Sequence, residues 1–143
     1  MHDHNLQRFL SAQQNTYATA LEEIKNGRKE SHWMWYIFPQ ISGLGFSETS
    51  KLYAIKDLKE AKGYLQEPVL GKRLIEISTA LLQLESNSPG RVFGSPDDMK
   101  LKSSMTLFAA ISFADPVFDK VLDKFFRGVR DAQTLQILDK QKS

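Results

Sequence analysis

The residues best suited to chemistry lie in one short segment of this sequence, Ser31-His32-Trp33-Met34-Trp35-Tyr36-Ile37-Phe38-Pro39-Gln40. The segment holds both tryptophans of the chain and its one histidine beyond residue 4. Indole N–H, imidazole and the Gln40 amide all need hydrogen-bond partners when they are buried. The segment therefore predicts either an aromatic wall for a planar ligand or a core helix whose histidine is satisfied by a backbone carbonyl. Residue chemistry alone favours the core helix.

A second candidate segment covers residues 97–108. Lys100 lies three and four residues before Ser103 and Ser104, so these polar side chains lie near one another on a helix. A lysine flanked by hydroxyls near a helix N-terminus suits an anion, because the helix dipole adds to the attraction. The alternative is a solvated face on which the two leading aspartates stabilise the helix start. Residue chemistry alone again favours the alternative without a ligand.

The third candidate is the loop from Pro39 to Gly45, whose backbone amides either line a ligand or form a plain turn. No dinucleotide fingerprint, phosphate-binding loop, nucleophile elbow or His-Glu-x-x-His pair occurs in the sequence. The absence of cysteine excludes disulfides, thiolate metal ligands and a cysteine nucleophile. His2 and His4, two residues apart, cannot share a helix face, and we expect residues 1–4 to be frayed. The sequence thus predicts no metal site and no cofactor.

Composition indicates a single globular domain over residues 1–143. Apolar residues make up 41% and charged residues 25% of the chain, which is typical of a globular domain. The net charge of 19 − 17 = +2 is too small to indicate nucleic-acid binding. No apolar run is long enough for a membrane span. The first residues lack the pattern of a signal peptide, and the lack of cysteine suits the cytoplasm, so we expect a cytoplasmic protein. Without a heptad seam or a free strand edge, we expect a monomer or a weak dimer.

The spacing of apolar residues at three and four predicts an all-α fold. No second strand-like run exists to pair with the aromatic segment, so that segment is also predicted to be a short helix. We expect about eight helices packed around one long central helix from Pro68 to about Ser86. The other helices are predicted over residues 5–26, 31–38, 47–55, 57–67, 96–112 and 116–128 and from residue 131 onward, with caps at Ser47, Asp57, Ser95 and Asp131.

Several blocks of the sequence resemble a known family. The aromatic segment with Gly43-Leu44-Gly45 carries the resemblance, together with Lys100-Leu101-Lys102-Ser103-Ser104-Met105-Thr106-Leu107-Phe108. Tyr53-Ala54-Ile55, Pro68-Val69-Leu70-Gly71 and the tail also match. The blocks are similar to a bacterial family of unknown function, domain-of-unknown-function family 1810, some of whose members bear the label calpastatin-like. The resemblance covers nearly the whole chain and implies a compact, mainly helical single domain, with no activity to transfer.

The family motif contains polar residues that packing alone does not require. With the resemblance, a binding site shared by the two segments is as well supported as the interpretation that both segments only pack in the core. We predict binding or processing of a small anionic, nucleotide-like ligand between the segments 31–40 and 97–108. A tryptophan would stack a planar group, Lys100 with a serine would hold the anion, and the histidine would act as general acid or base. The alternative is a protein–protein interaction module without catalytic activity. The predicted site residues are His32 as the catalytic residue, and Trp33, Trp35, Gln40, Lys100, Ser103 and Ser104 as ligand-binding residues.

Overall fold

The computed structural model describes residues 5–142, so the expected fraying of residues 1–4 and the histidines at 2 and 4 lie outside the described residues. Within residues 5–142 there are ten α-helices and no β-strand, which confirms the all-α prediction. One isolated parallel bridge joins Ile41 to Ile55. The helices are α1 (Gln7–Gln13), α2 (Tyr17–Lys25), α3 (Met34–Ile37), α4 (Glu48–Leu52), α5 (Leu58–Gln66), α6 (Pro68–Leu82), α7 (Pro89–Phe93), α8 (Asp97–Ala109), α9 (Val117–Phe126) and α10 (Ala132–Gln141).

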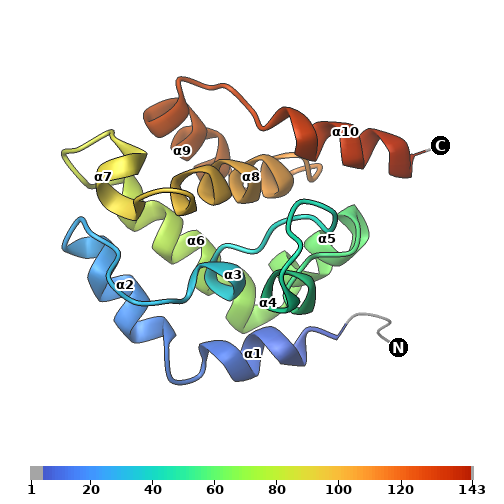
Figure 1. Ribbon diagram of the computed structural model, residues 1–143, viewed down its shortest axis with the longest axis horizontal. Helices are drawn as coiled ribbons and strands as arrows, with labels where there is room; N and C mark the ends of the chain where they lie inside the picture. The colour runs from blue at the N-terminus through green and yellow to red at the C-terminus, as the bar shows by residue number, and fades with distance from the viewer. Residues whose placement is uncertain (1–4, 143) are drawn as a thin grey trace.

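The long helix α6 lies at the centre of the fold, as predicted (Figure 1). It packs against α2, α5 and α9, while α8 packs against α5, α7, α9 and α10. The buried face of α6 carries Leu70, Leu74, Ile77 and Leu81, at the spacing of one helix face. Burial of this face and of the aromatic side chains around it is the main stabilisation of the fold, at about 25 cal/mol per Å² of apolar surface.

The predicted helix over residues 5–26 is two helices, α1 and α2, separated by a turn at residues 14–16. Both helices contact α6, but α1 also packs on α3, and Figure 1 shows the two helix axes at a marked angle. A straight helix cannot follow both directions, so tertiary packing overrides the continuous apolar pattern. This division, together with the short helix α7, where the sequence indicates only a single turn over residues 91–94, accounts for the larger number of helices.

Three other helices end earlier than predicted, and a feature of the structure accompanies each end. The helix expected over residues 47–55 stops at Leu52, because the amide of Ile55 donates to Gln40 O at 2.8 Å. α6 stops at Leu82, and the carbonyl of Leu84 instead accepts a 2.6 Å hydrogen bond from Lys124 Nζ. α8 stops at Ala109, four residues before Phe113, which has a left-handed φ of 64° that a helix cannot contain.

The helix starts were predicted more accurately than the ends. The side chains of Ser47, Asp57 and Asp131 each accept a hydrogen bond from the third residue after them, as expected of N-caps. The predicted cap at Ser95 is wrong. Pro96 occupies the N-cap position of α8, and no side chain caps this helix. In the described part of the chain, no helix has the length and apolar character needed to cross a membrane.

Candidate functional site

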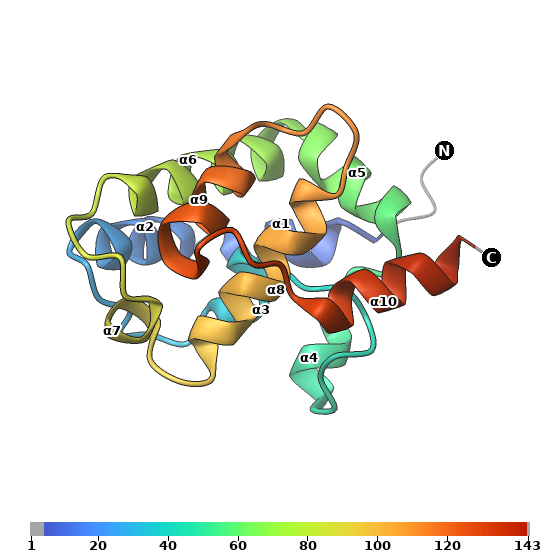
Figure 2. The ribbon, with the colours of Figure 1, turned by 90° about the horizontal axis from the view of Figure 1, so that it is seen from above.

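A pocket of about 240 Å³ lies where four stretches of the chain meet: α3 with the loop after it, residues 50–54, α8 and the start of α10. Figure 2 shows α4 and the N-terminal end of α10 on the same side of α8. The pocket combines polar and apolar side chains with the backbone of a glycine-containing loop. Its lining includes Trp35, Gln40, Ser42, Gly43, Gly45, Lys51, Tyr53, Pro96, Met99, Lys100, Ser103, Asp131 and Gln133.

The structure brings four of the predicted site residues together in this pocket: Trp35, Gln40, Lys100 and Ser103. The two segments that carry them, 31–40 and 97–108, are far apart in the sequence, so their meeting is a property of the fold. The other three predicted residues do not line the pocket, each for a different structural reason.

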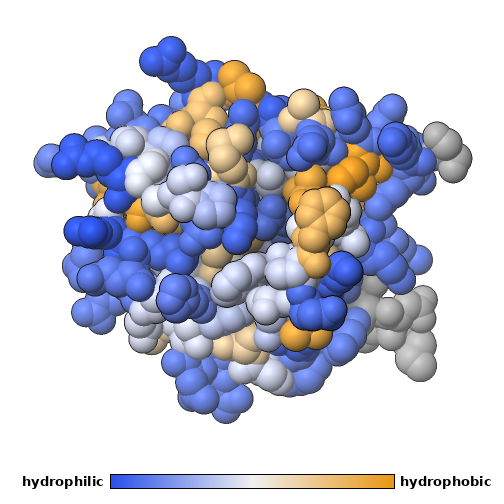
Figure 3. Space-filling model, viewed as in Figure 1, coloured by the Kyte–Doolittle hydropathy of each residue, from blue (hydrophilic) through white to orange (hydrophobic). Residues whose placement is uncertain are grey.

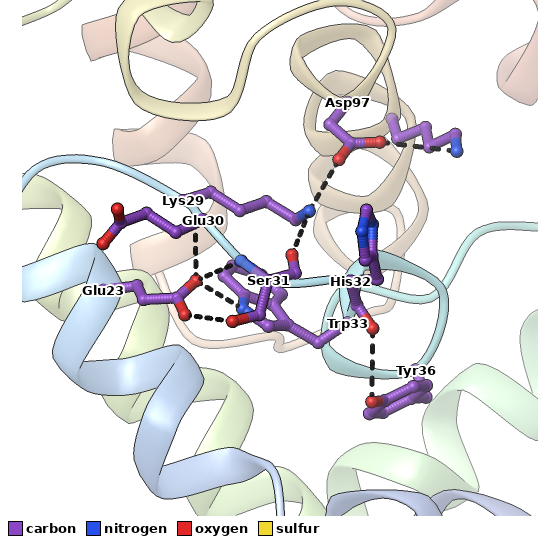
Figure 4. A network of polar contacts seen from close by, with 9 residues as sticks. Glu23, Lys29, Glu30, Ser31, His32, Trp33, Tyr36 and Asp97 are labelled. Atoms are coloured by element: carbon purple, nitrogen blue, oxygen red, sulfur yellow. Dashed lines mark hydrogen bonds and ion pairs between the residues drawn. The ribbon is translucent and has the colours of Figure 1, made fainter.

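Trp33 is fully buried, with 0% of its surface exposed, so its ring cannot stack on a ligand in this structure. Its indole N–H donates to Glu23 Oε1 at 2.9 Å (Figure 4). The same carboxylate accepts hydrogen bonds from the amides of Glu30 and Ser31 and from the Ser31 hydroxyl. Glu23 therefore fixes the segment that leads into α3, and Trp33 belongs to the core rather than to the pocket.

His32 is exposed and lies outside the pocket lining. Its imidazole points toward the N-terminal end of α8, and its backbone carbonyl faces the hydroxyl of Tyr36 at 3.5 Å (Figure 4). A general acid or base must reach the reacting atoms directly or through one water. We therefore assign no chemistry in the pocket to His32.

Ser104 is fully buried on the core side of α8, and its Oγ has no hydrogen-bond partner among the described residues. Because an unsatisfied buried hydroxyl costs free energy, we expect Ser104→Ala to raise the free energy of unfolding by up to about 1 kcal/mol. Urea unfolding measures the change. A decrease of about 1 kcal/mol or more in the free energy of unfolding would contradict the prediction, because it would show that the hydroxyl makes a stabilising hydrogen bond.

Lys100 carries a positive charge that its surroundings compensate only in part. Its Nζ lies 3.4 Å from Asp97 Oδ1 and 5.0 Å from the centre of the Trp35 ring. Asp97 Oδ2 is at the same time paired with Lys29 Nζ at 2.9 Å, so two lysines share one carboxylate. The three charges sum to +1, and the indole holds the ammonium at the wall of the pocket through a cation–π contact. Trp35 thus positions Lys100 in addition to forming part of the wall.

The loop after α3 lines the same pocket. The bridge between Ile41 and Ile55 anchors it, with Ser42 N donating to Ile55 O at 2.8 Å. Among residues 5–142, the amides of Gly43 and Gly45 have no hydrogen-bond partner. Gly43 has a φ of 106°, and a side chain at Gly45 would come within 2.6 Å of Ser50 Cβ, so both positions require glycine.

Sequence reasoning missed Asp131 as a pocket residue. It was predicted only as the N-cap of the last helix, a role the structure confirms. Its place in the pocket depends on contacts between residues that are distant in the sequence, so no local pattern signals it. Among residues 5–142 no three His, Asp or Glu side chains gather in a way that would hold a metal ion.

Fold and pocket define a compact all-α domain with a small surface pocket of mixed polarity. The chain belongs to the family described as Protein of unknown function (DUF1810), whose model matches residues 3–138, as the motif blocks indicated. The crystal structure of the conserved hypothetical protein Rv1873 from Mycobacterium tuberculosis is similar, with 44% sequence identity and a TM-score of 0.92. The match covers 94% of this chain and 96% of that chain. No curated protein matches the chain.

Proposed function

We propose that the protein binds a small organic anion in the pocket between α3, α8 and the start of α10. The observation that carries the proposal is the partly compensated charge of Lys100, which the Trp35 ring holds at the pocket wall. Gln40 and the unpaired amides of Gly43 and Gly45 add hydrogen-bond donors to the lining, whereas the Ser103 hydroxyl donates to Met99 O at 3.2 Å. Such donors are the usual partners of a phosphate or carboxylate.

The size of the pocket limits the ligand. Sites for drug-sized ligands are about 300–1,000 Å³, whereas this pocket is about 240 Å³. A phosphate with one sugar ring is therefore a better match than a dinucleotide. A nucleotide would place its phosphate and sugar inside and leave its base at the rim.

We expect inorganic phosphate and ribose 5-phosphate to raise the melting temperature of the protein, and Lys100→Ala to weaken their binding about tenfold or more. Loss of one charge-assisted hydrogen bond costs about 1.5–3 kcal/mol, and 1.4 kcal/mol is a factor of ten. A ligand at 100 times its Kd stabilises the folded state by about 2.7 kcal/mol, a shift of several degrees. Thermal shift followed by calorimetric titration measures both effects.

Lys102→Ala is the matched control. Lys102 lies on the same helix and is equally charged, but its Nζ contacts the ring of Phe126 and the residue does not line the pocket. We expect this variant to bind like the parent protein. If no anion binds, or if the two lysine variants lose affinity equally, the pocket is not an anion site.

An interaction module is the second candidate, and it rests on exposed apolar side chains at the rim of the pocket. Met99 lines the pocket and is 50% exposed, while Phe46 and Leu52, 86% and 55% exposed, directly follow lining residues. Figure 3 shows apolar side chains in several places on the visible face, among polar ones. Absence of any anion-induced shift would make this candidate the leading one.

A further inference from the structure

Asp131 places a carboxylate in a pocket that also holds two lysines, Lys51 and Lys100, and it is paired with neither of them. Among the described residues, the ion pair of Lys100 is with Asp97, and Asp131 forms none. A ligand that only carried negative charge would be repelled by Asp131. The lining therefore fits a ligand that carries hydrogen-bond donors as well as an anionic group.

One oxygen of Asp131 is fixed in place and the other is free. Its Oδ2 accepts hydrogen bonds from Thr134 N at 3.0 Å and from Thr134 Oγ1 at 2.6 Å. Its backbone amide donates to the hydroxyl of the buried Thr106 at 2.9 Å, which ties the residue to α8. Its Oδ1 has no partner among residues 5–142. The carboxylate is thus held rigidly with one acceptor oxygen unused.

We propose that the ligand is a hydroxylated organic phosphate, a sugar phosphate or the ribose phosphate part of a nucleotide, and that Asp131 accepts a hydrogen bond from its hydroxyl groups. The inference rests on the proposed anion site. A carboxylate is a common acceptor for sugar hydroxyls, as in the acidic residue that binds ribose in dinucleotide sites. The amide groups of Gln40 and Gln133 in the same lining can donate to and accept from further hydroxyls, and the Ser103 oxygen, whose proton is donated to Met99 O, can accept from one.

The test compares three probes by calorimetric titration: ribose 5-phosphate, inorganic phosphate and glycine. The proteins are the parent chain, Asp131→Asn, Lys100→Ala and the control Asp139→Asn. Asparagine is also a good N-cap, so α10 is retained in the first variant. Asp139 lies on α10 outside the pocket lining and is exposed.

We expect the parent chain to bind ribose 5-phosphate at least tenfold more tightly than inorganic phosphate. Asp131→Asn should weaken ribose 5-phosphate about tenfold and leave inorganic phosphate unchanged or slightly tighter, since a negative charge is removed from the pocket. A loss of affinity for ribose 5-phosphate alone cannot come from a purely structural role, which would weaken the binding of both phosphates. Asp139→Asn should change neither affinity.

The proposed hydroxyl recognition and the proposed anion site fail in different ways. If both phosphates bind and depend on Lys100 but Asp131→Asn does not alter their ratio, the hydroxyl recognition is wrong and the anion site stands. If a zwitterion such as glycine binds more tightly than ribose 5-phosphate, the partner of Asp131 is an ammonium group, and the proposed hydroxyl recognition is again wrong. If neither phosphate binds, the anion site itself is wrong. Asp131→Ser, which retains a capping oxygen, replaces the first variant if that variant unfolds.

Discussion

Gly71→Ala is expected to destabilise the protein by about 3 kcal/mol or more, or to prevent folding. A Cβ atom at this position of α6 would lie 2.0 Å from the backbone oxygen of Leu65 and 2.9 Å from its carbonyl carbon. Backbone atoms at the end of α5 cannot rotate away as a side chain can, so the two helices would have to separate. Urea or thermal unfolding of the variant measures the loss.

The sign of this prediction is opposite to that of helix propensity. Alanine in a helix interior is normally about 1 kcal/mol more favourable than glycine, so propensity alone predicts a more stable variant. Gly90→Ala in α7 is the control, because the nearest atom to its added Cβ would be Ser88 Oγ at 4.0 Å. We expect the control to stay within about 0.5 kcal/mol of the parent protein. A Gly71 variant as stable as the parent would show that α5 and α6 can move apart freely.

Features of the fold that depend on local chemistry were predictable from the sequence. The caps at Ser47, Asp57 and Asp131 need only a short polar side chain three residues before a free amide. The central helix needs only a regular apolar spacing. The break between α1 and α2 was missed, since it arises from the different helices that α1 and α2 pack against, which no local pattern encodes.

The candidate site was predictable as two segments but not residue by residue. Successive residues of a helix are about 100° apart around its axis, so residues close in sequence point to different surroundings. Trp33 is directed into the core beside Glu23, whereas Trp35 faces Lys100. Trp33 is the tryptophan that enters the core because Glu23, ten residues earlier on another helix, accepts the hydrogen bond of its indole.

Glu23→Gln is expected to lower the free energy of unfolding by about 2 kcal/mol at pH 7. Burial raises the pKa of Glu23, but hydrogen bonds from the Ser31 hydroxyl, the amides of Glu30 and Ser31 and the Trp33 indole outweigh it and lower the pKa to about 2. Glutamine keeps one acceptor oxygen for the three N–H groups but loses the charge, and its NH2 group cannot accept the hydrogen bond that the Ser31 hydroxyl donates to Glu23. Urea unfolding of the parent and the variant gives the difference.

The pH dependence of that difference separates the charge of Glu23 from its shape. Because the pKa is lower in the folded state than the ordinary value of 4.5, the stabilisation by the charge is complete above about pH 5 and is lost as the pH falls toward 2. The parent and the variant should therefore converge in stability between pH 5 and pH 2, since a protonated Glu23 is as uncharged as glutamine. Glu22→Gln, one residue away and exposed, should differ from the parent by no more than about 0.5 kcal/mol at any pH. A difference in the free energy of unfolding between parent and Glu23→Gln that stays constant down to pH 2 would mean that the carboxylate acts by its shape alone. A difference that disappears would show that the charge of Glu23 holds the segment leading into α3. That segment leads to Trp35, which positions Lys100.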